Sequence, residues 1–232
     1  MTNISALLDK ICKCLATGRN RGLGTVSLAA ILTLMSPDAR ATVVLTVSGC
    51  TLGCTTSPYA TVDLVQDGIS IDVTVTLGSD PNGPYHFHLA PDTKHHAFAF
   101  DLSGDPGVII SGLTAGFDLA GTLPGSFTSV PFGTFAYAIN CTGCGSGYGG
   151  GLTGPLTFKI TPTSGSLTPA SFIANSMGHD FAVDIVDFNN NSGNVSDPGT
   201  VIQNTPEPAT AILIGTSLLG LAGLLRRQRR RR

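Results

Sequence analysis

The chain has 232 residues, of which 42% are hydrophobic and only 12% are charged, and its formal net charge is −2. Eleven of its 13 Lys and Arg residues lie before position 42 or after position 225, so positions 42–205 hold two basic residues against twelve Asp residues. Because nucleic-acid binding depends on Lys and Arg that neutralise phosphates, this distribution excludes a nucleic-acid partner and predicts an acidic, solvated surface.

The first 41 residues have the parts of a secretory signal peptide. Four basic residues precede an apolar run from Leu23 to Met35, and small residues follow at Ala39 and Ala41. Signal peptidase accepts this A-x-A arrangement. We therefore expect residues 1–41 to engage the Sec translocon and to be removed by signal peptidase after Ala41. The alternative is a retained anchor, for which the run is short compared with about 20 residues.

The body, residues 42–188, has a hydrophobic period of two rather than 3.6. Gly, Pro, Asn and Asp separate the periodic segments, and Asp67-Gly68 forms a hairpin-turn signal. This pattern predicts an all-β fold, an antiparallel β-sandwich or a jelly-roll-like arrangement. The expected strands are residues 42–48, 60–66, 69–77, 85–90, 96–102, 107–113, 115–121, 133–140, 156–162 and 180–188.

Two shorter segments depart from this pattern. Thr168 is a suitable helix N-cap and Pro169 suits the first helical position. With Phe172 and Ile173 as its apolar face, one short helix is expected there. Residues 189–204 are polar and short of large apolar side chains, so we expect a mobile stalk that links the body to the C-terminal segment.

The six cysteines form three close pairs, one of which, Cys12 and Cys14, lies in the expected signal peptide. An oxidising compartment favours disulfides for the other four, and four cysteines allow three pairings. The short spacing within each pair favours local bonds. A tetrahedral zinc site and free or redox-active thiols are the alternatives. The expected disulfides join Cys50 to Cys54 and Cys141 to Cys144.

Four of the five histidines fall between positions 86 and 96. On a strand, the spacing His-x-His places two imidazoles on one face, and imidazole suits zinc, copper or nickel. A turn near Asp92 could bring further histidines opposite them. The alternative is a half-exposed hairpin whose polar face is histidine. The candidate metal ligands are His86, His88, His95 and His96; no cofactor is expected otherwise, and no catalytic motif is present.

The C-terminal segment, residues 205–232, has three parts in order. Pro206-Glu207-Pro208 precedes an apolar run from Ala209 to Leu225, and an arginine-rich end follows. The run is at the lower limit for a transmembrane helix, and an excess of arginine marks the cytoplasmic side of a membrane. The expected cytoplasmic stop consists of Arg226, Arg227, Arg229, Arg230, Arg231 and Arg232.

This order of Pro-Glu-Pro, apolar span and arginine tail resembles the PEP-CTERM sorting signal of Gram-negative bacteria. The resemblance covers only residues 205–232. It implies an inner-membrane intermediate, recognition by an exosortase, cleavage near the motif, and release or transfer of the body to the cell surface or exterior. Members of this family are typical of organisms that make exopolysaccharide and biofilm matrix.

The expected function is therefore that of a non-enzymatic, exported protein of the cell surface or extracellular matrix. Its expected partners are the exosortase, the signal peptidase with the Sec translocon, the inner membrane transiently, and exopolysaccharide. Two alternatives stay open. One is a carbohydrate- or ice-binding module, and the other is a metal-binding protein that uses the histidine cluster.

Overall fold

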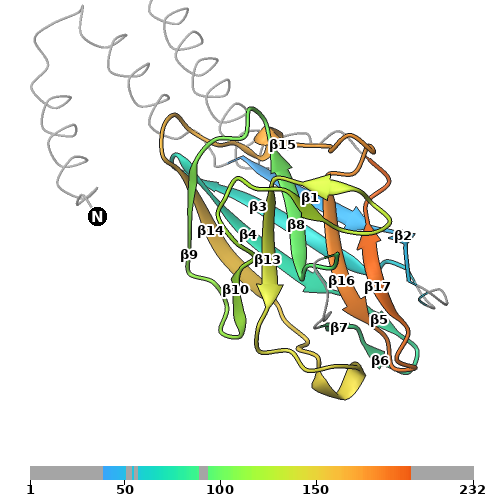
Figure 1. Ribbon diagram of the computed structural model, residues 1–232. Coiled ribbons are helices and arrows are strands. Elements are labelled where there is room, and N and C mark those ends of the chain that lie inside the picture. The colour runs from blue at the N-terminus through green and yellow to red at the C-terminus, as the bar shows by residue number, and fades with distance from the viewer. Residues whose placement is uncertain (1–38, 51–53, 55–56, 89–93, 200–232) are drawn as a thin grey trace, which may run out of the picture. The chain divides into compact units, whose positions relative to one another are not determined.

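The computed structural model describes residues 39–50, 54, 57–88 and 94–199, which Figure 1 shows as coloured ribbon. Nearly all of the expected signal peptide lies outside these residues. The whole segment 205–232 also lies outside them, including Pro-Glu-Pro, the apolar run and the arginine tail. Within the described ranges, no helix has the length and hydrophobicity to cross a membrane.

The described residues form antiparallel β-sheets with almost no helix, which confirms the predicted all-β class. One sheet has five strands, in the spatial order β1 (Arg40–Leu45), β3 (Ala60–Asp67), β4 (Ser70–Leu77), β14 (Leu156–Pro162) and β9 (Val108–Ser111). The predicted turn joins β3 to β4, where Asp67 pairs with Ser70 and Gly68 has φ +63°. Glycine adopts this left-handed conformation without steric cost.

The other main sheet has eight strands. Six follow the order β10 (Phe117–Leu119), β13 (Tyr137–Cys141), β8 (Phe98–Leu102), β16 (Phe181–Val186), β17 (Ser192–Ser196) and β2 (Val47–Ser48). Two more strands pair beside this path, β15 (Phe172–Ile173) with β8 and β7 (His86–Phe87) with β16. Separate two-stranded ribbons consist of β5 (Ser79–Asp80) with β6 (Gly83–Pro84), and of β11 (Phe127–Thr128) with β12 (Thr134–Phe135).

The two main sheets share one hydrophobic core. Phe158 of β14 in the first sheet contacts Phe98 and Phe100 of β8 in the second, with ring centroids 5.9 and 6.2 Å apart. Phe98 also stacks on Phe181, and Phe100 stacks on Tyr137. Aromatic pairs of this kind add to the stabilisation that burial of their large surfaces already provides. Figure 1 shows the second sheet in front of the first.

Strand β16 is buried on both faces. Phe181, Val183 and Ile185 belong to the shared core, so the alternating residues point to the opposite face. That outer face is covered as well, because Ala182 packs in a second apolar cluster with Phe132 and other side chains from the connecting loops. Loops therefore cover the outer side of the eight-stranded sheet over β16, and Asp184 on that face is buried.

The predicted short helix is reduced to a single turn. A 3-10 helix, η2 (Pro169–Ser171), begins at the predicted positions, with Thr168 as N-cap and its backbone N–H donating to Ser171 Oγ at 3.0 Å. It ends before the expected apolar face. Phe172 and Ile173 instead form β15, which buries Phe172 in the core and leaves Ile173 exposed. Here the alternation of a strand overrides the helix signal.

The predicted stalk, residues 189–204, is wrong in its described part. Ser192–Ser196 form β17, which pairs with β16 on one side and β2 on the other. The segment folds although it is polar, because Asn194 Nδ2 and the Ser196 hydroxyl donate hydrogen bonds to backbone carbonyls of Val130 and Phe181. The domain therefore extends beyond Phe188, and residues 200–204 lie outside the described part of the chain.

At the other end of the domain, β1 begins at Arg40. Arg40 pairs with Val65 and Ala41 pairs with Leu64, and Ala41 is buried in the core. Cleavage after Ala41 would remove these two residues from the strand.

Candidate functional site

The centre of the candidate site is a polar pair on the outer face of the eight-stranded sheet. Asp184 of β16 lies opposite Asn194 of β17 in the ladder. Both are buried, and Asp184 is 1% exposed. A carboxylate removed from water at this depth needs charged or hydrogen-bonding partners.

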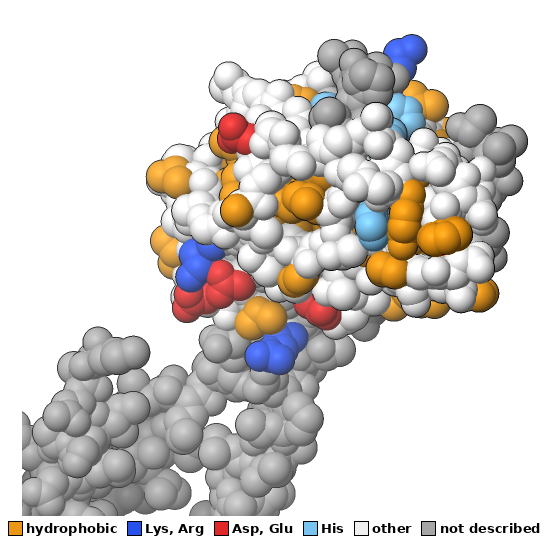
Figure 2. Space-filling model, turned by 90° about the horizontal axis from the view of Figure 1, so that it is seen from below, with side chains coloured by type: hydrophobic (Ala, Val, Ile, Leu, Met, Phe, Trp, Pro, Cys, Tyr) orange, Lys and Arg blue, Asp and Glu red, His pale blue; other side chains and the backbone are white. Residues whose placement is uncertain are grey.

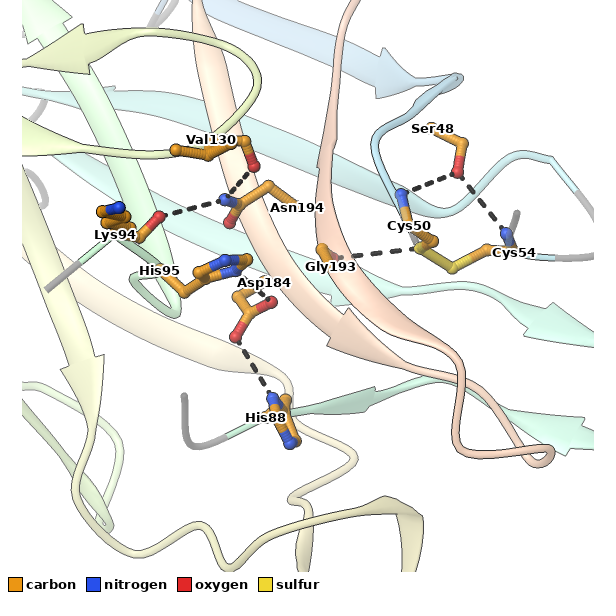
Figure 3. A network of polar contacts seen from close by, with 10 residues as sticks. All are labelled: Ser48, Cys50, Cys54, His88, Lys94, His95, Val130, Asp184, Gly193 and Asn194. Carbon is orange, nitrogen blue, oxygen red and sulfur yellow. Dashed lines mark hydrogen bonds and ion pairs between the residues drawn. A yellow bond between two sulfur atoms is a disulfide. The ribbon is translucent and has the colours of Figure 1, made fainter. Parts of the chain in front are cut away.

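Two histidines supply partners for Asp184. The Nδ1 atom of His88 lies 3.4 Å from Asp184 Oδ2, and Nδ1 of His95 lies 3.3 Å from Asp184 Oδ1. His88 comes from the end of β7, whereas His95 comes from the segment before β8, and Figure 3 shows both rings turned towards the carboxylate. One buried aspartate thus contacts two imidazoles, both through Nδ1, so Nε2 is in each ring the nitrogen that does not face it.

The other two candidate ligands point elsewhere. Nδ1 of His86 donates to the Tyr148 carbonyl at 2.8 Å, and Nδ1 of His96 lies 2.7 Å from Asn140 Oδ1. The expected four-histidine group is therefore not formed, and Asp92 lies outside the described residues. Among the residues that the structure describes, no group of three or more His, Cys, Asp or Glu side chains is placed to hold a metal ion.

Asn194 joins the covering loops to the sheet by hydrogen bonds. Its Nδ2 donates to the Val130 carbonyl at 2.7 Å and reaches the Lys94 carbonyl at 3.5 Å (Figure 3). Because His95 directly follows Lys94, the same amide positions the backbone that presents His95 to Asp184. No local pattern could indicate this role, since Asn194 and Lys94 are a hundred positions apart.

Both expected cysteine pairs lie at disulfide distance. The Cα atoms of Cys50 and Cys54 are 5.6 Å apart, and those of Cys141 and Cys144 are 5.4 Å apart. These separations fall in the usual range for disulfides. The backbone N–H groups of Cys50 and Cys54 lie 3.3 and 3.5 Å from Ser48 Oγ (Figure 3), so the first loop is joined to the end of β2.

The aspartates divide into two groups, which corrects the expectation of a uniformly solvated acidic surface. Asp63, Asp67, Asp72 and others lie on the outside, but five are buried: Asp80, Asp180, Asp184, Asp187 and Asp197. Several buried ones hold turns. Asp80 Oδ1 accepts the N–H groups of Asn82 and Gly83, for example. Short polar side chains favour turns through such local hydrogen bonds.

A second polar cluster lies where the described chain ends. Asp180 directly precedes β16 and Asp197 directly follows β17, and both are buried. Burial is the main cause that raises the pKa of Asp180, to about 7, followed by repulsion from the Asp197 carboxyl and a hydrogen bond between the two side chains. Asp180 therefore keeps its proton to a higher pH than a carboxyl group in water does.

The end of the molecule near η1 (Tyr148–Gly150) carries an aromatic cluster. The His86 ring stacks on Tyr148 at 4.0 Å, and Phe188 meets Tyr148 edge-on at 5.3 Å. The Tyr148 N–H donates to Asn190 Oδ1, and Phe188 is 51% exposed. Figure 2 views the molecule from this side and shows hydrophobic side chains gathered there, with few charged ones among them.

Comparisons of the chain with known protein families, with curated proteins and with solved structures found no match.

Proposed function

We propose that this chain is an exported, non-enzymatic surface protein whose body is a disulfide-bonded β-sandwich. Its N-terminal segment directs it through the Sec translocon. An exosortase recognises its C-terminal Pro-Glu-Pro segment and releases the protein to the cell surface or the extracellular matrix. There it associates with exopolysaccharide.

The pairing of the four body cysteines is the observation that carries this proposal. Each pair lies at disulfide distance within a single loop. Disulfides persist in oxidising compartments outside the cytoplasm and are rare inside it. The remaining cysteines, Cys12 and Cys14, stand within the expected signal peptide. Every cysteine expected in the mature protein therefore has a bonding partner, as suits an exported domain.

The test is to express the full chain in a Gram-negative host that has an exosortase, and to block free thiols during lysis. Mass spectrometry of each cell fraction then reports thiol state and chain ends together. We expect the body outside the inner membrane, with its four cysteines unmodified by the thiol reagent and residues 1–41 absent. A body that stays in the cytoplasm with four blocked thiols would refute the proposal.

The aromatic cluster favours carbohydrate binding as a second candidate function. Sugar rings pack their C–H faces on aromatic side chains, and amides such as that of Asn190 suit their hydroxyl groups. The disulfide Cys141–Cys144 stiffens the loop that carries Tyr148, which would limit the entropy lost on binding.

Retention of the full chain on immobilised neutral polysaccharides tests this second candidate. Phe188→Ala should abolish the retention. Ile109→Ala, which removes an exposed apolar side chain from β9 in the other sheet, should leave it unchanged. Equal retention of both variants and the unmodified chain would exclude the cluster as the binding site.

A further inference from the structure

The peptide bond between Asp197 and Pro198 stands at the exit of the domain. Asp197 is 0% exposed, whereas Pro198 and Gly199 are exposed. Gly199 has φ +75°, and a Cβ atom placed on it would lie 2.1 Å from the Gly178 carbonyl oxygen. The chain therefore makes a fixed, close turn directly after this bond, and only glycine fits that turn.

The carbonyl group of the bond is polarised by a histidine. Nδ1 of His179 lies 2.9 Å from the Asp197 carbonyl oxygen, and because a carbonyl can only accept, the imidazole N–H donates. The His179 ring packs edge-on against Phe132, with centroids 4.8 Å apart, so its direction is fixed. A donor held against a carbonyl oxygen stabilises the negative charge that develops there when the carbonyl carbon is attacked.

The Asp197 side chain is held beside its own carbonyl group. The Gly199 N–H donates to Oδ2 at 2.7 Å, and the N–H groups of Asp180 and Phe181 donate to Oδ1 at 3.0 Å each. These bonds fix the carboxyl group over the turn. A carboxyl group held in one position can close a five-membered ring onto its own carbonyl carbon without first being ordered.

Asp180 supplies a proton at the same place. Its buried Oδ2 receives no hydrogen bond from any other group in the described ranges of the chain. An oxygen buried in this way is costly unless it carries a proton that it can donate. Burial, with the Asp197 carboxyl group as its neighbour, raises the pKa of Asp180 and favours this protonated form.

We infer that the chain cleaves itself between Asp197 and Pro198. The Asp197 side-chain oxygen attacks the Asp197 carbonyl carbon while His179 donates to the carbonyl oxygen. The C–N bond to Pro198 breaks, the proline nitrogen takes the proton of Asp180, and a cyclic anhydride of Asp197 forms. Water opens the anhydride to the Asp197 side-chain carboxylate and a new C-terminal carboxylate; of the two protons released, one returns to Asp180 and the other goes to the new proline amine.

The same chain contains an internal control. Asp105-Pro106-Gly107 repeats the Asp-Pro-Gly sequence, but Asp105 is exposed, and its bond lies on a loop after β8. Self-cleavage at Asp197 would free the body from residues 198–232, which include the whole expected sorting segment. Release by this route needs no sorting enzyme, so the inference stands or falls separately from the proposed function.

The experiment follows the purified full chain, produced in a host without an exosortase, at pH 5, 7 and 9 with protease inhibitors present. We expect a body that ends at Asp197 and a fragment that begins at Pro198, formed with a first-order rate that is independent of dilution. The rate should fall as the pH rises through about 7, because Asp180 then loses its proton. The titratable groups around the bond are Asp180, Asp197 and His179. The Asp105–Pro106 bond should stay intact.

Variants separate the chemistry from folding. Pro198→Ala, at an exposed position, keeps every hydrogen bond of Asp197 and should slow cleavage at least about tenfold, because an ordinary amide nitrogen is a poorer leaving group than proline. His179→Phe keeps the ring packing, and Asp180→Asn keeps a donor to Asp197; each should slow cleavage roughly a hundredfold. Asp180→Asn should also remove the fall in rate near neutral pH.

A folded full chain, with both disulfides formed, that remains intact at all three pH values would overturn the inference. Cleavage that proceeds equally fast in His179→Phe and Asp180→Asn would overturn the assigned roles. Cleavage at Asp105–Pro106 at the same rate would show ordinary acid lability and would also refute it.

Discussion

Strands β4 and β17 are both buried, but they are buried in different ways. In β4, Ile71, Val73 and Val75 enter the core while the residues between them face outwards. β17 has only one large apolar side chain, Val195. The buried Asn194 amide and Ser196 hydroxyl donate hydrogen bonds to backbone carbonyls, whereas Asn194 Oδ1 has no hydrogen-bond partner among the described residues. A polar segment can therefore be buried when its donors find acceptors elsewhere in the fold.

The largest loss of stability is expected in the apolar core, to which both β4 and β8 contribute. Phe100 contacts Tyr137, Phe158 and Phe172 in the core. Phe100→Ala should lower the free energy of unfolding by about 4 kcal/mol, since it removes buried surface and leaves a cavity. Urea unfolding followed by circular dichroism measures the loss. A loss below about 1 kcal/mol would mean that the two sheets do not share a tight core.

The next effect concerns the carboxyl pair that flanks β16 and β17. The pKa of Asp180 is raised from 3.8 to about 7 in the folded protein, so the folded state holds a proton that the unfolded state releases. The stabilisation that this bound proton provides is fully present below about pH 4 and is lost as the pH rises to about 7. We expect a loss of up to about 4 kcal/mol over this window.

Thermal and urea unfolding at pH 4.5 and pH 8 check this prediction. The variant Asp180→Asn should show a much flatter pH dependence. If the variant and the unmodified chain respond identically to pH, the carboxyl pair is not the source of the effect.

The contribution of the buried hydrogen bonds of β17 is tested at Asn194. Asn194→Ala leaves the Val130 carbonyl without its amide donor, and should cost about 2 kcal/mol of folding free energy. The matched control is Asn189→Ala, because Asn189 is exposed in the turn between β16 and β17. If both variants are equally stable, residues 189–199 are attached to the domain only loosely, as the predicted stalk would be.

A smaller effect is expected from the second disulfide. Replacing Cys141 and Cys144 together by Ser should lower the free energy of unfolding by about 1.5 kcal/mol, because a short closed loop removes little entropy from the unfolded chain. Proteolysis within residues 145–155 should also become faster. Unchanged stability and unchanged proteolysis would show that the loop is held by its other contacts.

The smallest change is expected on the outer face of the first sheet. Lys159 forms ion pairs with Asp67 and Asp72, and all three side chains are solvated. Lys159→Ala should leave the midpoint of urea unfolding nearly unchanged, since water and salt screen such pairs. A marked loss would show that this face is covered in solution.

The strands in which hydrophobic residues alternate with polar ones could be predicted from the sequence. Strands such as β3, β4 and β14 alternate between core and surface, and Asp67-Gly68 marks its turn. β17 could not be predicted, because its hydrogen-bond partners come from distant loops. The helix prediction was wrong after Ser171, where pairing with β8 outweighs the local signal of Thr168 and Pro169.

The candidate site was predictable only in its local parts. The disulfide partners are near each other in the chain, so the spacing of the cysteines was informative. The contact of His95 with Asp184 spans 89 positions, and the register between β7, β8 and β16 that creates it is a property of the whole sheet. No pattern near His95 indicates its partner, and none separates it from His96.

The most direct test of the account is the intact mass of the body recovered from outside the inner membrane, after thiol blocking without reduction. The account predicts that residues 1–41 are absent and that the blocking reagent has added no mass, because Cys50, Cys54, Cys141 and Cys144 are joined in two disulfides. A body found only in the cytoplasm, with residues 1–41 retained and four added blocking groups, would contradict it.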